Sequence, residues 1–280
     1  VVADSLAVLG DILFQRHQYS ESIELQRVAR AVKVKIRGEN HPSSILSLNG
    51  IAKCLKALGR LDEARSMFEQ CVISTRRLYG DRNFSTSVSL FELSRVLQLV
   101  EEYDTALTMA EQALQIRLDV EKGLEGKVCP AYGSSSPHFY LGQLYLQLGE
   151  LYRALGDAEH AKVYFAKSRN VSRDLLGSVE SEAGVEAMTG LAWALEALGT
   201  RDEAAALSPS IKRCAQNVYV SKDEAFVKEL NDMGKILRAR GKYSEARNYF
   251  TKARMVGRIV HGEQHVNTVD SLEGLAWLLE

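Results

Sequence analysis

The segment HGEQH contains the residue pair whose spacing most directly suggests metal chemistry, His261 and His265. Two imidazoles four residues apart lie on one face of a helix and can share a metal ion. Gly262 falls between them, however, and both lie in a turn like the one that contains His41 near the start of the chain. We therefore expect a structural role for these histidines and no metal site.

Other residue patterns that support catalysis are missing from the sequence. It has no phosphate-cradling glycine loop, no HExxH, no GxSxG elbow and no EF-hand spacing of acids. Carboxylate pairs such as Glu101 and Glu102 fall at predicted turns, where exposed charge is ordinary. The four cysteines, Cys54, Cys71, Cys129 and Cys214, form no CxxC pair. We expect a protein that is not an enzyme, with no cofactor and with reduced thiols.

Charge and composition narrow the class of partner. The 280 residues carry 35 basic and 36 acidic side chains, a balance that does not favour nucleic acid or an anionic membrane surface. No apolar stretch approaches the roughly 20 residues that span a bilayer, so we expect no membrane insertion. The opening VVADSLAVLG has no signal-peptide order and begins mid-pattern. These features predict a piece of a larger cytoplasmic protein.

One short phrase recurs along the whole chain. It reads HQYSES, GRLDEA, EEYDTA, GDAEHA, GTRDEA and GKYSEA, and it ends on the small residues Ser22, Ala64, Ala106, Ala161, Ala204 and Ala246. The steps between these residues are 42, 42, 55, 43 and 42. A fixed period of this length indicates stacked supersecondary units.

Each copy of the phrase has a physical role. A Gly or polar residue ends one helix, and an acidic residue in the next first turn satisfies free amide donors. Apolar stripes at helical spacing stand on both sides, so each unit is a helical hairpin that must stack on its neighbours. Only four prolines occur, and Pro209 is expected to bend or restart a helix. We predict one repeat array over residues 1–280, with hairpins at about 1–44, 45–86, 87–136, 137–184, 185–226 and 227–268, a partial one at 269–280, and an inserted loop at about 121–138.

The turn phrase resembles that of the tetratricopeptide repeat. Units of 42 residues whose second helix ends in an LG..HP turn are similar to kinesin light chain, and here that turn reads RGENHP, YGDRNF, LGSVES and HGEQHV. The resemblance implies an all-α fold, a right-handed α-solenoid of tetratricopeptide-like helical hairpins. It also implies a non-catalytic scaffold or adaptor whose concave groove binds a peptide motif or a helix of a partner protein.

The resemblance further assigns groove positions on the first helix of each hairpin. The candidates in this chain are Asn49, Lys53, Lys56, Arg95, Gln98, Arg153, Trp193, Lys228, Asn231, Lys235 and Arg238. Lys53, Lys56 and Arg95 come from adjacent hairpins and suit an acidic linear motif. The asparagines typical of that family's groove are missing at Gly50 and Glu92. Trp193, and Trp277 at the corresponding place, fit either ligand contact or packing against a neighbouring helix.

Two other functions remain open. In the first hypothesis the array is an architectural layer of a cytoskeletal or ciliary assembly. In the second it is the sensing arm of a larger nucleoside-triphosphatase switch protein. Localisation is expected to be cytoplasmic, with association to the cytoskeleton or a cilium as the finer expectation. The apolar residues Leu275, Leu278 and Leu279 near the end of the chain predict self-association through that end.

Overall fold

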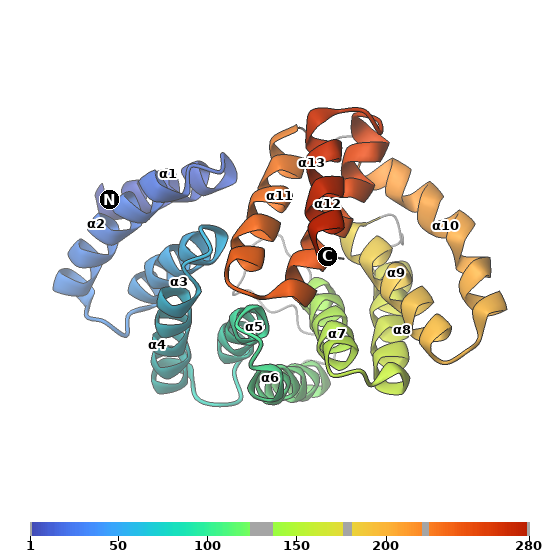
Figure 1. The fold of residues 1–280 in the computed structure, drawn as a ribbon. Helices are drawn as coiled ribbons and strands as arrows, with labels where there is room; N and C mark the ends of the chain where they lie inside the picture. The colour runs from blue at the N-terminus through green and yellow to red at the C-terminus, as the bar shows by residue number, and fades with distance from the viewer. Residues whose placement is uncertain (1, 124–136, 176–180, 220–223, 279–280) are drawn as a thin grey trace. The chain divides into compact units, whose positions relative to one another are not determined.

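A computed structural model describes residues 2–123, 137–175, 181–219 and 224–278 (Figure 1). The chain divides into two compact units, residues 1–128 and 129–280. The described residues of both units are helical hairpins joined by short turns, and no strand occurs in them. Among these residues no helix is both long and apolar enough to cross a membrane. The predicted all-α array of tetratricopeptide-like hairpins is confirmed.

The first compact unit contains three hairpins. Its helices are α1 (Val2–Gln15), α2 (Tyr19–Arg37), α3 (Pro42–Ala57), α4 (Leu61–Tyr79), α5 (Phe84–Leu99) and α6 (Tyr103–Gly123). The two helices of a hairpin pack on each other, and α2 and α4 also pack on the first helix of the following hairpin (Figure 1). This pairing is what the apolar stripes on both sides of each turn predict.

The second compact unit contains three further hairpins and one first helix. Its helices are α7 (Pro137–Ala154), α8 (Ala158–Leu175), α9 (Glu182–Ala197), α10 (Arg201–Tyr219), α11 (Glu224–Ala239), α12 (Tyr243–Val260) and α13 (Val266–Trp277). The predicted loop at about 121–138 lies mostly outside the described residues. The prediction of one continuous array over residues 1–280 stays a prediction.

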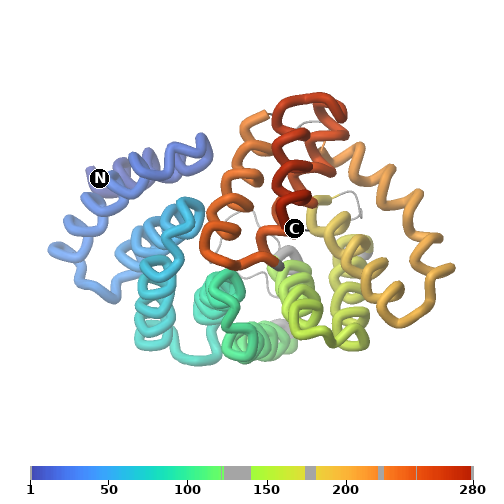
Figure 2. The backbone as a smooth tube through the Cα atoms, in the orientation of Figure 1, coloured from blue at the N-terminus to red at the C-terminus, as the bar shows by residue number. Residues whose placement is uncertain are grey.

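Helix α10 continues through Pro209, so the restart, which is one of the two outcomes that the sequence predicted, does not occur; the bend stays a prediction. The structure assigns α10 as one helix from Arg201 to Tyr219, and the tube in Figure 2 follows it as a single element. Proline removes one backbone donor from the helix interior and crowds the preceding turn. The side chains of Ala205, Ala206 and Pro209 are exposed. This exposure leaves room for α10 to accommodate the ring.

The turn inside each hairpin needs a left-handed residue. Gly59, Gly156, Gly199 and Gly241 take φ values of 70°, 79°, 82° and 76° in this slot. In the first and third hairpins the slot is filled by His17, with φ 61°, and Glu101, with φ 62°. A residue with a Cβ atom pays about 1 kcal/mol or more in this conformation. Two of the six turns are therefore strained by their sequence.

The turn between hairpins is organised by a capping side chain. His41 accepts a hydrogen bond from the backbone amide of Ser43, and Asn83 accepts one from Ser85, so each satisfies a free donor at a helix start. Ser181 and His265 cap α9 and α13 in the same way. The repeated turn thus ends where a helix starts, at His41–Pro42 for α3 and at Asn83–Phe84 for α5. Different side chains cap these helix starts.

Phenylalanine rings from the second helices pack into notches made by glycines. The ring of Phe165 lies between Gly149 and Gly190, and a methyl group added at Gly149 would stand 2.7 Å from it. Phe250 lies in the same way between Gly234 and Gly274, with a distance of 2.8 Å at Gly234. Because the two glycines come from consecutive first helices, each ring joins two hairpins.

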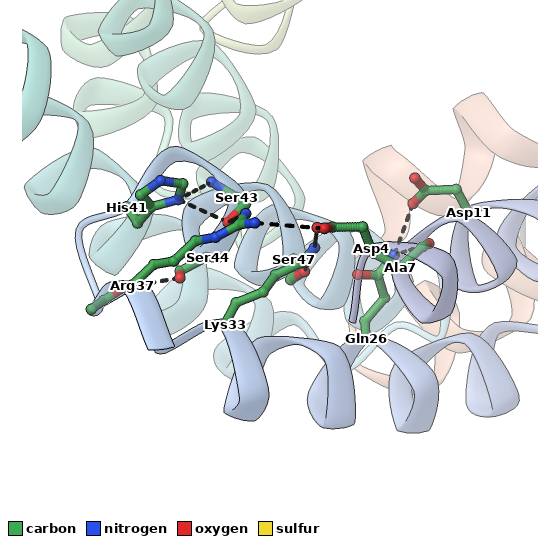
Figure 3. A network of polar contacts seen from close by, with 11 residues as sticks. Asp4, Ala7, Asp11, Gln26, Lys33, Arg37, His41, Ser43, Ser44 and Ser47 are labelled. Atoms are coloured by element: carbon green, nitrogen blue, oxygen red, sulfur yellow. Dashed lines mark hydrogen bonds and ion pairs between the residues drawn. The ribbon is translucent and has the colours of Figure 1, made fainter. Parts of the chain in front are cut away.

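The first hairpin replaces this ring with polar groups. Gln26 of α2 lies between Gly10 and Gly50, where its Nε2 donates to Ala7 O at 3.0 Å and to Asp11 Oδ1 at 2.8 Å (Figure 3). Two turns further along α2, the buried Lys33 donates to Ser47 Oγ at 3.1 Å and lies 3.7 Å from Asp4 (Figure 3). This hairpin is held by hydrogen bonds where others use an aromatic ring.

Candidate peptide-binding surface

Three of the predicted groove cations meet at one carboxylate in the first compact unit. Lys56 Nζ of α3 donates to Glu92 Oε2 of α5 at 2.8 Å. Lys53 Nζ lies 3.8 Å from Glu92 Oε1, and Arg95 Nη1 lies 3.9 Å from Oε2. The structure therefore brings Lys53, Lys56 and Arg95 together, but around an acid that the sequence interpretation noted only as a missing asparagine.

Burial separates the cations of this cluster into two kinds. The side chains of Lys56 and Glu92 are 16 % and 8 % exposed, whereas those of Lys53 and Arg95 are 36 % and 44 % exposed. A separation of 3.8 Å or more is too long for a hydrogen bond. Lys56 is thus held in a hydrogen-bonded ion pair with Glu92. Lys53 and Arg95 face solvent with donors that Glu92 does not bind.

The electrostatics of the cluster show an excess of positive charge. Burial alone would raise the pKa of Glu92, but Lys56, Arg95 and Lys53 hold it well below its usual range. Burial, and then the charge of Arg95, lower the pKa of Lys56 to about 8. The charge of Arg95 contributes to both shifts, because a positive potential lowers the pKa of acids and bases alike, whereas burial contributes only to the lowering at Lys56. On the α1 side, burial raises the pKa of Asp11, and Lys53 partly offsets that rise.

The remaining candidates of the first compact unit flank this cluster. Asn49 and Gln98 are both half-buried, on α3 and α5 respectively. Arg95 also lies over the ring of Phe91, with 5.7 Å from its guanidinium carbon to the ring centroid. The exposed part of the cluster therefore has an aromatic ring beside it.

In the second compact unit, Arg153 and Trp193 are adjacent but largely engaged. Arg153 pairs with Glu150 three residues before it and lies over the indole of Trp193, with 6.0 Å to the ring centroid. Trp193 packs against the apolar cluster of α7 to α10. The packing interpretation of Trp193 therefore describes most of its surface. Burial raises the pKa of Glu150, and Arg153 offsets part of that rise.

The second predicted cluster is dispersed. Asn231 is fully buried. Its Nδ2 donates to Asn267 O at 2.8 Å, and its Oδ1 accepts from Ser271 Oγ at 2.7 Å. Its expected outward position is incorrect, since α13 covers it. Lys235 pairs with Asp270 of α13 at 2.6 Å. Arg238 lies over the exposed Trp277 at 4.8 Å, and Lys228 is exposed elsewhere on α11.

The two histidines just before the C-terminal helix α13 make contacts within the protein. His261 and His265 stack with their ring centroids 4.6 Å apart, and His265 caps α13. Within the described residues no group of three or more His, Cys, Asp or Glu side chains gathers as metal ligands would. Leu275 and Leu278 are both half-buried, and Leu279 lies outside the described residues. Self-association through this end stays a prediction.

Models of the tetratricopeptide repeat match residues 2–72, 48–119, 142–172 and 230–267. The chain is a tetratricopeptide repeat protein. Repeats of this family form protein-interaction scaffolds, and solved kinesin light chain-like repeats share the fold. The kinesin light chain nearly identical TPR-like repeats of Podosopora anserina share the fold, with a TM-score of 0.58 and 23 % identity over 75 % of this chain and 93 % of that one.

Two other comparisons extend this relationship. The apo form of RapI superposes with a TM-score of 0.65 and 12 % identity, over 100 % of this chain and 97 % of that one. A clustered mitochondria protein homolog of Emericella nidulans is 28 % identical over 115 residues, which is 40 % of this chain. The matched part is only 9 % of the length of that relative.

Sequence reasoning missed Glu92 and a separate group of ion pairs around Lys252. Glu92 stands where Gly50, Gly190 and Gly274 stand in other hairpins, at the closest approach of one first helix to the preceding hairpin. A large charged residue at a glycine position was the signal that could have found it. Glu182 and Glu186 of α9 bind Lys252 of α12, a contact between residues about 70 positions apart that no local pattern indicates.

Proposed function

We propose that this tetratricopeptide array is a non-catalytic adaptor that binds an acidic linear motif of a partner protein on the surface formed by α3 and α5. The observation that carries the proposal is the pair of solvent-facing cations, Lys53 and Arg95, that lie next to the buried Lys56–Glu92 pair. Buried Glu92 lies 3.8 Å from Lys53 and 3.9 Å from Arg95 and attracts both cations without binding their donors. The exposed donors then recognise an external carboxylate.

The two cations suit different parts of one ligand. The guanidinium of Arg95 presents a planar fork that matches a carboxylate, and the ammonium of Lys53 is a compact point charge. Because they come from consecutive hairpins, an extended segment crossing α3 and α5 would meet both. Two acidic residues close together in the segment would therefore satisfy this surface better than one.

Direct binding of defined peptides tests the proposal. The probe is a fluorescein-labelled heptapeptide with two adjacent glutamates in a Gly/Ser background, and the reference peptide has glutamines in their place. We expect saturable binding of the glutamate peptide that weakens as salt rises. The double variant Lys53→Glu/Arg95→Glu should bind at least tenfold more weakly. Arg27→Glu, an exposed reversal on α2, is the matched control and should stay within about twofold of wild type.

Unchanged binding by the double variant would remove the proposed site. Both side chains are exposed, so we expect the fold to survive, and an unchanged circular dichroism melting curve verifies it. Equal binding of the glutamine peptide would show that the charges of the motif are not recognised, which also contradicts the proposal.

We further propose a cytoplasmic, cytoskeleton-associated role for the whole protein. The kinesin light chain-like repeats support it, and so does a relative whose name refers to clustered mitochondria. Fluorescence microscopy of the full-length tagged protein tests this proposal. A distribution that does not change when microtubules are depolymerised would contradict it. The architectural and switch-arm alternatives stay predictions.

A further inference from the structure

The last three helices of the second compact unit form a self-contained piece. Helices α11, α12 and α13 all pack on one another, and the ring of Phe250 fills their own notch between Gly234 and Gly274. Helices α7, α8 and α9 repeat this arrangement around Phe165. Each set of three helices therefore has its own packing centre and does not need the other to bury its ring.

The junction between the two sets differs from the other junctions. At the other junctions inside each compact unit, the second helix of a hairpin packs on the first helix of the next, as α8 does on α9 and α12 on α13. Here α10 packs along α12, which is the second helix of the following hairpin. An apolar cluster forms where they meet, and its buried members are Val185, Met188, Cys214, Ala215, Tyr219, Val227, Leu230, Ala253 and Val256.

A single cation bridges the edge of this cluster. Lys252 Nζ of α12 donates to Glu182 Oε1 of α9 at 2.8 Å and also to Glu186 Oε1, while 25 % of its side chain stays exposed. Burial alone would lower the pKa of Lys252, but Glu186 and Glu182 outweigh it and raise that pKa. Beside them the buried Tyr219 hydroxyl has no hydrogen-bond partner among the described residues. The polar edge of the junction is thus incompletely satisfied.

We propose that Lys252 is a latch, and that its release from Glu182 and Glu186 lets α11–α13 move away from α7–α10 as one folded piece. The ion pairs lie at the edge of the junction, where water and salt reach them. Behind them lies the apolar cluster, which forms the rest of this junction. Because each set keeps its own Phe–Gly notch, opening disrupts the junction and leaves the helices folded.

Cys214 is a native probe of this movement. It is fully buried in α10 at the junction, whereas the buried Cys54 and Cys71 lie in the first compact unit and serve as internal references. A buried thiol reacts only when its surroundings open, so its labelling rate measures the opening. Peptide mass spectrometry after timed alkylation of the full chain follows these three of its four cysteines in one sample.

The variants isolate the latch from general stability. We expect Lys252→Met to raise the labelling rate of Cys214 at least tenfold and to leave Cys54 and Cys71 unchanged. Lys252→Arg should restore a nearly wild-type rate. The control Lys235→Met removes a cation that pairs with Asp270 inside the α11–α13 piece, so Cys214 should be unaffected.

Hydrogen exchange separates opening from local unfolding. In Lys252→Met the backbone amides of α12 around Phe250 should stay as protected as in wild type, because the piece moves while folded. An unchanged Cys214 rate would overturn the proposal, and so would a parallel rise at all three cysteines. Loss of α12 protection together with faster Cys214 labelling would also overturn it, since the helices would then be unfolding.

Discussion

The two compact units contain ion-pair clusters with opposite proportions of positive and negative charge. In the first unit three cations surround one buried carboxylate, Glu92, and two of them face solvent. In the second unit one cation, Lys252, stands between two carboxylates of α9 and joins two sets of helices. The first arrangement leaves positive charge available to a partner. The second uses its charge for contacts within the chain.

The units also differ in how they fill the same structural slots. The second unit places phenylalanine rings in two notches and glycine in all three of its left-handed turns. The first unit has Gln26 in one notch, and His17 and Glu101 in two of its turns. One backbone framework therefore tolerates substitutions that cost stability, and the costs are concentrated in the unit that carries the exposed cations.

The largest expected difference concerns the notch. Phe165→Ala removes a fully buried ring shared by two hairpins, so we expect a loss of about 3–5 kcal/mol in the free energy of unfolding. Gln26→Ala at the corresponding place should cost about 1–2 kcal/mol, because two hydrogen bonds are lost and no ring is removed. Urea unfolding followed by circular dichroism measures both. Equal losses would show that the two notches are equivalent.

Neutralising the central acids should distinguish the two charge clusters. Glu92→Gln leaves the mostly buried Lys56 without its anion, and we expect a loss of about 2–4 kcal/mol in the free energy of unfolding. Glu186→Gln should cost about 1 kcal/mol, because Lys252 keeps Glu182. Urea unfolding again measures both variants. A larger loss for Glu186→Gln would reverse the comparison.

Peptide binding should depend on pH through Lys56. Its pKa is lowered to about 8, and a bound anion favours the protonated form. Affinity for the acidic heptapeptide is therefore full below this pKa and should fall about fivefold as the pH rises to about 9, which is roughly 1 kcal/mol. Lys56→Met should bind more weakly at neutral pH and show little further change. A wild-type affinity that is flat from about pH 7 to about pH 9 would contradict this.

The smallest expected effects are in the turns. Glu101→Gly and His17→Gly remove the side chain from a residue whose backbone is left-handed, which relieves backbone strain. Each change should add about 0.5–1 kcal/mol to the free energy of unfolding. The converse change Gly156→Ala in the second unit should remove about 1 kcal/mol. Thermal unfolding of the three variants measures them. If the glycine variants melt below wild type, the contacts of the original side chains outweigh the backbone strain.

The sequence predicted the hairpins well because their signals are local. A left-handed glycine, an acidic first turn and a small residue recur within six positions, and each acts on its own neighbourhood. The gathering of Lys53, Lys56 and Arg95 followed from the period and the assigned groove positions. The sequence did not show that Lys56 pairs with a buried acid while Lys53 and Arg95 stay exposed, because this difference depends on Glu92.

The errors arose where two elements compete for one surface. Asn231 was expected to face outward, and the packing of α13 on α11 buries it. The contact of α10 with α12 was not expected either, because α11 and α12 both carry apolar stripes that could cover α10. Periodicity identifies which face of a helix is apolar. It does not identify which of two adjacent apolar faces a third helix will choose.

The helix caps have a consequence for how these repeats can change in length. His41, Ser181 and His265 each precede the notch glycine of their helix, Gly50, Gly190 or Gly274, by the same nine residues. A helix turns by about 100° per residue, so one residue inserted inside this interval would carry the glycine off the facing side chain. This interval of nine residues therefore fixes the rotation of each first helix about its own axis. Variation in length is confined to the turns between helices.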